Sequence, residues 1–288
     1  MASNPVFNRI EREAEQGYAG FRDRAPQPPQ PAGSWGATDQ MTDRQLQDLY
    51  SQPSAGPVQT GRLTLDDVVM KFSGLFALVL VFASIGWALA PSPVGPVIML
   101  GGIAATLVLG LVIAFKKTIS VPLIVAYAVV EGLFVGAISQ IYSVQFDPEG
   151  TPAFQGIVAQ AVIATLSVFV GMLLAYKTGL IKVTEKFRRI MTMAIIGYAI
   201  FAVVNLGYAL ISGEQFGLGG TGALGMAISV FAIGLASFSL ALDFDSIERA
   251  IAAGAPQKYS WLLAHGLIVT LVWLYLEILR LLGRLRSE

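Results

Sequence analysis

The chain has 288 residues, of which 55% are hydrophobic and only 13% are charged, so it is far more apolar than a soluble domain. Its 19 acidic residues balance 19 basic ones, and the Lys and Arg residues form no concentrated patch, so binding to DNA or RNA is not expected. Cysteine is absent, which excludes disulfides, thiolate metal sites and a cysteine nucleophile.

Residues 1–64 differ in composition from the rest of the chain. They hold half of the 14 prolines, and they contain no apolar segment that could form a core or the hydrophobic part of a signal peptide. Two short amphipathic stretches, at about 8–16 and 41–50, are assigned no role. We expect residues 1–64 to form a disordered cytoplasmic tail, and the first apolar span to direct the chain to the membrane.

From Val68 onward the sequence consists of apolar runs of about 20 residues, long enough to cross a hydrocarbon layer of about 30 Å as helices. Small residues recur inside these runs, as at Gly132 and Gly136, and allow helices to pack closely. The pattern predicts an all-α membrane protein in which residues 65–288 form a bundle of seven transmembrane helices. The expected spans are about 68–90, 94–114, 121–143, 153–176, 190–211, 219–242 and 259–282.

The charges of the connecting segments alternate between the two sides of the predicted bundle. One side has Lys116, Lys117, the cluster 177–189, Arg249 and Lys258, and the other has Asp147, Glu149 and Glu214. The positive-inside rule then predicts a cytoplasmic N-terminus in a plasma or inner cell membrane. Three arginines break this rule after the seventh span. Either the last segment is re-entrant or these side chains extend to the outer interface, and we favour seven crossings; the three are Arg280, Arg284 and Arg286.

Two acids, Asp243 and Asp245, lie at the end of the sixth span, where an ionised carboxylate is costly. Positions two apart on a helix differ by about 200°, so the two side chains cannot share a face. Steps of three and four residues from Asp243 reach small or hydroxylated positions, namely Gly225, Ser229, Ala232, Ala236, Ser239 and Ser246. We therefore predict that Asp243 faces the interior. For Asp245 the simplest interpretation is an ion pair with Arg249 near the surface, and ion binding is the alternative.

Glu131 and Glu277 also interrupt apolar spans. Glu277 is either an ion-binding group or one half of an ordinary helical ion pair with Arg280. Glu131 has no basic residue within one turn, so it is either an ion or proton site or a permanently protonated hydrogen-bond donor. His265, the one histidine, has no second His or Cys to complete a metal site, so we expect it near the cytoplasmic interface instead.

The last two spans carry two acid-bearing motifs in order, Leu242-Asp243-Phe-Asp-Ser-Ile247-Glu and Trp273-Leu-Tyr-Leu-Glu277-Ile-Leu-Arg-Leu-Leu282. Together with the stretch Glu131-Gly-Leu-Phe-Val-Gly136 and the seven spans, they resemble the Bax inhibitor-1 family of multi-pass membrane proteins. The resemblance covers residues 68–288, and the Asn4-Pro-Val-Phe7 opening with its long polar tail is similar to the bacterial long-tailed branch of that family.

The resemblance implies a helical bundle in the lipid bilayer that leaks calcium, or a similar cation, down its gradient in a pH-dependent way. It also implies a facing pair of carboxylates, with Asp243 as the first acid and Glu277 as the second, that binds protons and the transported metal ion; no further cofactor is implied. The chain departs from the family pattern because the second acid is more often Asp and because the interval between the acids is longer here. If the helix after Tyr259 began at the bilayer surface, Glu277 would lie about 27 Å higher and could not meet an acid at the inner end of the sixth span. We therefore expect Tyr259 to Gly266 to project below the hydrocarbon.

Two carboxyl groups that face each other away from water cannot easily both be ionised, so such a pair is expected to share a proton near neutrality. Calcium prefers oxygen ligands and would displace that proton, and acidification would reverse the exchange. We expect protonation of the pair to shift the helices between closed and conducting arrangements.

The sequence leaves one alternative class of function open and disfavours three others. A membrane-embedded regulator that binds other membrane proteins is the main alternative, and such roles are also associated with the family. A secondary transporter would require two repeated halves, which the sequence does not show. A retinal pump lacks a lysine in the seventh span, and a membrane hydrolase lacks both a His-Glu-x-x-His pair and a nucleophile constellation, so an enzyme is not expected.

Overall fold

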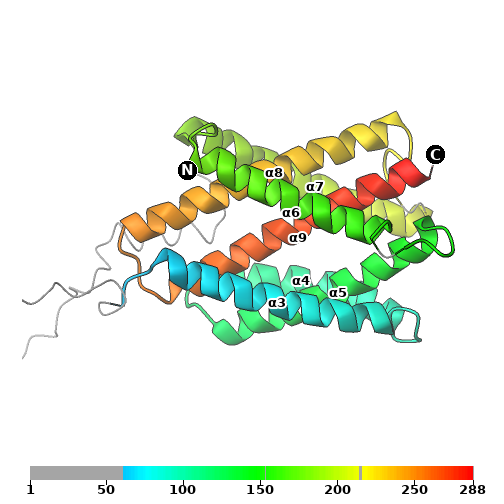
Figure 1. Cartoon of the computed structure of the whole chain (residues 1–288), viewed down its shortest axis with the longest axis horizontal. Coiled ribbons are helices and arrows are strands. Elements are labelled where there is room, and N and C mark those ends of the chain that lie inside the picture. Colours follow the sequence, from blue (N-terminus) through cyan, green and yellow to red (C-terminus); the bar gives the residue numbers. More distant parts are fainter. Residues whose placement is uncertain (1–60, 153, 214–215, 288) are drawn as a thin grey trace, which may run out of the picture.

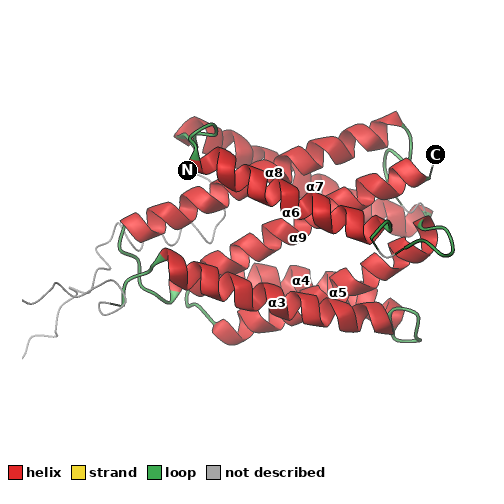
Figure 2. Ribbon diagram, in the orientation of Figure 1, coloured by secondary structure: helices red, strands yellow, loops and turns green. Residues whose placement is uncertain are grey.

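The computed structural model describes residues 61–152, 154–213 and 216–287, and these ranges form seven long helices and no strand (Figures 1 and 2). Every helix is long and apolar enough to cross a membrane, which confirms the predicted all-α, seven-helix membrane architecture. The helices are α3 (Leu65–Leu89), α4 (Gly95–Phe115), α5 (Val121–Phe146), α6 (Ile157–Lys177), α7 (Glu185–Ser212), α8 (Ala223–Ala252) and α9 (Tyr259–Arg286).

The predicted tail at 1–64 lies outside the described residues except for its last four positions. Three of these four, Gly61 to Leu63, pack against the α8–α9 connection, and Thr64 caps α3. Arg62 forms a β-bridge with Pro256, and Leu63 is buried while its amide donates to the carbonyl of Ala255 at 2.8 Å. The beginning of α3 is thereby held against the start of α9.

Two helices extend well beyond the apolar runs that predicted them. α7 begins at Glu185, and not near 190, because the Thr184 hydroxyl caps it by accepting from the amide of Phe187 at 3.2 Å. α8 continues to Ala252, ten residues past the predicted end at 242, through a charged segment whose side chains are paired with neighbouring helices. Asp243 therefore lies more than two turns inside its helix and not at its end.

α9 is the central helix of the bundle and by far the most buried one. It contacts α3, α5, α6 and α8, whereas α4 packs on α5 and α3, and α7 packs on α8 (Figure 1). Large apolar side chains on the outer helices are exposed, as at Val97, Phe115 and Ile200. Apolar side chains on the outside of the bundle are what contact with lipid requires.

The glycines of α5 allow α3 to approach very closely, as the sequence predicted. A Cβ atom on Gly132 would lie 2.7 Å from the carbonyl oxygen of Val79, and one on Gly136 would collide with the backbone of Ala83. Gly86 of α3 has the reciprocal contact with the backbone of Leu133. Small residues four apart thus let the two backbones pack without intervening side chains.

The connections between the antiparallel helices lie at the two ends of the bundle. The end that holds the α4–α5, α6–α7 and α8–α9 connections carries the predicted basic residues and is called the basic end; the opposite end is called the C-terminal end. At the C-terminal end Arg286 forms an ion pair with Asp147, next to the α5–α6 connection. Because α9 is one unbroken helix from end to end, the last segment is not re-entrant.

Candidate functional site

One face of α8 brings small and polar residues into the centre of the bundle. The stripe predicted from helical periodicity is buried along its whole length, at Gly225, Ser229, Ala232, Ala236, Ser239, Asp243 and Ser246. The prediction that Asp243 faces the interior is therefore confirmed. The physical reason is that small side chains let α8 lie close to α9 and leave the carboxyl group little access to solvent.

Asp243 is 5% exposed and lies within reach of the Thr270 hydroxyl of α9. Its oxygen Oδ2 has no hydrogen-bond partner among the described residues. Thr270 is itself buried and donates its hydroxyl hydrogen to the carbonyl of Gly266 at 3.2 Å, so its oxygen is left as an acceptor. The α8–α9 contact thus contains a carboxyl group with one oxygen unused, a group that is costly to bury as an anion.

Glu277 lies further along α9, and its carboxylate accepts hydrogen bonds from three side chains. Arg280 donates to both carboxylate oxygens at 3.0 and 3.1 Å, the Tyr198 hydroxyl donates at 2.5 Å, and the Trp273 indole donates at 3.2 Å. The carboxylate is only 5% exposed at its side chain, whereas Arg280 is 35% exposed. The ordinary helical ion pair left open by the sequence is therefore present, and Tyr198 also ties it to α7.

The structure does not bring Asp243 and Glu277 together. Thr270, the α9 residue opposite Asp243, precedes Glu277 by seven residues, which corresponds to about 10 Å along the helix axis. The two acids are thus arranged in succession along the α8–α9 contact, with Glu277 nearer the C-terminal end. The reason is the long interval between the two acids in the chain. A projection of the first turns of α9 below the hydrocarbon does not bring the acids together across this interval.

A small cavity of about 110 Å³ lies above Glu277 toward the C-terminal end. It is lined by α7, α8 and α9, and its polar wall includes Tyr198, Asn205, Arg280 and Arg284. Arg284 is 2% exposed and donates to the carbonyl of Gly225 and to the hydroxyl of Ser229. This cavity ends at the Glu277–Arg280 ion pair.

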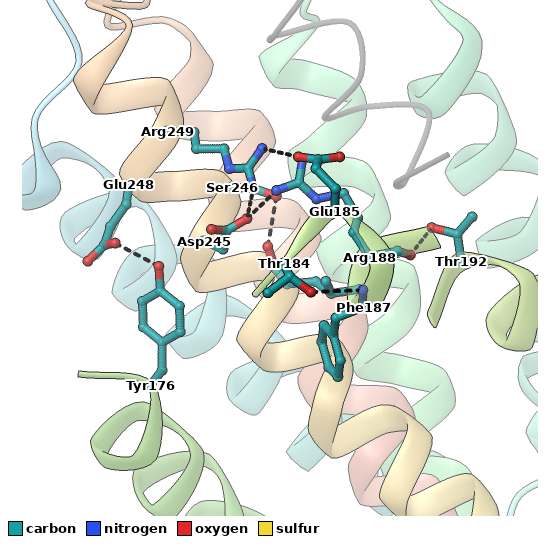
Figure 3. Close-up of polar contacts among 11 residues, drawn as sticks. Tyr176, Thr184, Glu185, Phe187, Arg188, Thr192, Asp245, Ser246, Glu248 and Arg249 are labelled. Carbon is teal, nitrogen blue, oxygen red and sulfur yellow. Dashed lines mark hydrogen bonds and ion pairs between the residues drawn. The ribbon is translucent and has the colours of Figure 1, made fainter. Parts of the chain in front are cut away.

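Asp245 belongs to an ion-pair cluster at the basic end (Figure 3). Arg188 of α7 donates to Asp245 Oδ2 at 2.6 Å, and Arg249 approaches the same oxygen at 3.0 Å. Arg249 also reaches Glu185 at 3.4 Å. The predicted pairing with Arg249 is present, but the buried Arg188 is the closer partner, so Asp245 joins two helices and is not a surface pair alone.

The same part of the bundle contains a second link between helices. Tyr176 at the end of α6 donates its hydroxyl hydrogen to Glu248 of α8 at 2.6 Å (Figure 3). α8 is thus connected to α6 through Glu248 and to α7 through Asp245. These contacts hold three helix ends together at the basic end.

Glu131 lies on the other side of α9, within α5. It is buried, it accepts a hydrogen bond from the Tyr127 hydroxyl at 2.8 Å, and its second oxygen has no partner in the described part of the chain. The Tyr127 ring in turn meets His265 edge to face at 4.5 Å between ring centroids. His265 is buried among the helices, six residues after the start of α9 at the basic end.

The acids are too dispersed to form a metal site from side chains alone. Within the described ranges, no group of three or more His, Asp or Glu residues is placed to hold a metal ion. A cation at Asp243 would need its other ligands from hydroxyls, backbone carbonyls and water, which are the usual additional ligands of hard cations.

The sequence identified Asp243 but not its partner. Thr270 was visible on the same face of the last span as Glu277, yet a lone threonine in an apolar helix gives no signal of its role. Tyr198 and Arg188 were equally hidden, because their partners lie 79 and 57 positions away in the chain. The only sign of such partners in the sequence was a hydroxyl or cationic side chain on an otherwise apolar helix face.

A protein-family model described as Bax inhibitor 1 like matches residues 4–287, which is nearly the full chain. No curated protein is similar enough to the chain to count as a match.

Proposed function

The chain belongs to the Bax inhibitor 1 like family, and we propose that it conducts calcium or a similar cation down its gradient in a pH-dependent way, with Asp243 as the group that binds either the cation or a proton. The proposal includes the positive-inside orientation, with the basic end in the cytoplasm of a plasma or inner cell membrane.

The observation that carries the proposal is the environment of the Asp243 carboxyl group. It lies on the interior face of a membrane-spanning helix, it is 5% exposed, and one oxygen has no described partner. A structural carboxylate in such a place would be paired with a cation, as Asp245 is with Arg188. An unpaired acid inside a membrane bundle is expected to exchange protons or ions.

The chemistry is a competition for one carboxyl group. When Asp243 holds a proton it is neutral and can donate that proton to the hydroxyl oxygen of Thr270, so the closed packing of α8 on α9 is favoured. When the proton leaves, the anion attracts a hard cation and water, and both must enter between the helices. Acidification therefore opposes cation binding at this position.

Glu277 enters the proposal as part of the closure on the C-terminal side. Its contacts with Arg280 and Tyr198 separate the small cavity above from Asp243 below. A cation that passes this level must displace Arg280, whose partly exposed side chain can turn toward the cavity. The two acids then act in succession and not as one pair.

The test is calcium efflux from proteoliposomes that contain the purified protein, followed with a calcium dye at several external pH values. Asp243→Asn is expected to reduce efflux about tenfold and to remove its pH dependence, because the amide cannot bind a proton or a cation in the same way. Asp66→Asn, which changes an exposed acid at the start of α3, is the matched control and is expected to keep both.

Two results separate the proposal from its rivals. If Asp243→Asn leaves efflux and its pH profile unchanged, the proposal is wrong. If Glu277→Gln alone removes the pH dependence as fully as Asp243→Asn, the acids work as a joint site in the conducting state. Deletion of residues 1–60 tests the regulator alternative, which predicts loss of cellular activity while efflux remains intact.

A further inference from the structure

We propose that a groove between α3 and α6 binds one acyl chain of a membrane lipid from the leaflet at the C-terminal end. The groove is a cavity of about 590 Å³ that opens sideways from the bundle. Its floor is formed by α5 and α9 and its walls by α3 and α6, and α9 is visible between these two helices in Figure 1. None of the candidate ion-binding acids lines it.

Toward the basic end, the groove stops at a contact between α3 and α6. There the rings of Phe72 and Phe169 stack, with 6.0 Å between centroids and an interplanar angle of 4°. In their described ranges the two helices nowhere bring Cα atoms within 8 Å of each other. The gap toward the C-terminal end is therefore built into the way both helices pack on α9.

The lining of the groove is almost entirely apolar, and its hydroxyl groups are already satisfied. Ser139 and Tyr275 on the floor share a hydrogen bond of 2.6 Å, and Thr165 on one wall donates to the carbonyl of Ala161 at 2.7 Å. Ser84 on the other wall donates to the carbonyl of Leu80 at 3.0 Å. Because each of these hydroxyl hydrogens is already donated within the protein, the floor and walls favour a hydrocarbon over a polar occupant.

The length of the groove fits one lipid chain. The wall from Phe76 to Trp87 covers twelve residues of α3, which rise by about 16 Å, close to the roughly 15 Å thickness of one hydrocarbon leaflet. A groove of this length suits an acyl chain, whereas a partner helix that crosses the membrane would need a groove about twice as long.

The position of the groove also fits one leaflet. Trp87 lies at its outer limit, near the end of α3, and aromatic rings of this kind favour the level of the lipid headgroups. Lipid tails are as apolar as the groove, so binding depends on van der Waals contact and on filling space that bulk lipid would otherwise leave poorly packed.

The experiment uses the full-length protein in nanodiscs that contain a phosphatidylcholine with a diazirine near the middle of one acyl chain. After illumination, labelled peptides are mapped by mass spectrometry. We expect labels to concentrate on the facing walls, at Leu80 and Leu166, over equally exposed apolar residues elsewhere, such as Ile196 on α7. Val162→Trp, which fills the groove from α6, is expected to reduce wall labelling about fivefold, because only ordinary lipid-facing surface remains.

Val170→Trp is the matched control, since it introduces the same side chain on the same helix outside the groove, and it is expected to leave wall labelling unchanged. Ala83→Phe fills the groove from α3 and gives the same reading should Val162→Trp fail to fold, as judged by size-exclusion chromatography. The proposal is overturned by labelling in simple proportion to exposure, by wall labelling that neither filling variant reduces, or by crosslinks from the wall residues to another polypeptide instead of lipid.

Discussion

The ion pair between Glu277 and Arg280 offers the sharpest test of how the C-terminal end is closed. The variants are Glu277→Gln, Arg280→Met and the two combined. Glu277→Gln keeps an oxygen that can accept from Tyr198 and Trp273 but removes the charge. Arg280→Met keeps the length and apolar stem of the side chain and removes its two hydrogen bonds to the carboxylate.

The expected free energies follow from the burial of the two partners. Arg280→Met leaves the Glu277 carboxylate, 5% exposed, without a counterion and should lower the free energy of unfolding by about 3 kcal/mol. Glu277→Gln should cost only about 1–2 kcal/mol, because Arg280 is less enclosed than the carboxylate and the new amide oxygen can still accept from it. The double variant leaves no unpaired buried charge and should lose about 1–2 kcal/mol, so the coupling energy should be about 3 kcal/mol.

The assay is unfolding of the purified protein in mild detergent by titration with a denaturing detergent, followed by circular dichroism. A parallel cycle that combines Glu277→Gln with Lys117→Met, at the opposite end of the bundle, should be additive to within about 0.5 kcal/mol. If the Glu277–Arg280 cycle is equally additive, the two side chains are not coupled and the closure described above does not depend on them.

Two further outcomes test the packing and the basic end. Gly136→Ala should lower the free energy of unfolding by about 2 kcal/mol in the same titration, because its Cβ would collide with the backbone of Ala83; Gly74→Ala, with no atom within 4 Å, should change it by less than about 1 kcal/mol, and equal effects would contradict the close α3–α5 contact. Asp245→Asn should lower it by about 2–3 kcal/mol by removing the nearer carboxylate of the buried Arg188, whose contact with the exposed Glu185 is longer, at 3.9 Å, and added salt should reproduce little of this loss; a variant as stable as the parent protein would show that the cluster contributes nothing.

The helices were predictable from the sequence to the extent that hydrophobic length defines them. Runs of about 20 apolar residues locate α3 to α6 within a few residues, because a span must match the thickness of the hydrocarbon. The method fails where a helix continues into charged residues, as α8 does to Ala252. Asp245 and Glu248 remain helical because Arg188 and Tyr176 on other helices satisfy them, and hydropathy contains no information about such partners.

The candidate site was predictable only in part, for a similar reason. Helical periodicity is a local property, so the interior position of Asp243 followed from the small residues on its own helix face. The partner of that acid depends on how far α9 is shifted along α8. This shift places Thr270, and not Glu277, opposite Asp243.

The sequence by itself determined that the chain is a bundle of seven apolar helices, that Gly132 and Gly136 let helices pack closely, and that one face of α8 carries a buried acid, because all three depend on side chains within one helix. Only the tertiary structure decided which partners from other helices meet each acid, such as Arg188 at Asp245 and Tyr198 at Glu277. The axial position and rotation of packed helices arise from many weak contacts between distant segments. Here α9 is offset along α8 by two turns, so Asp243 lies beside Thr270 and does not meet Glu277, which pairs with Arg280.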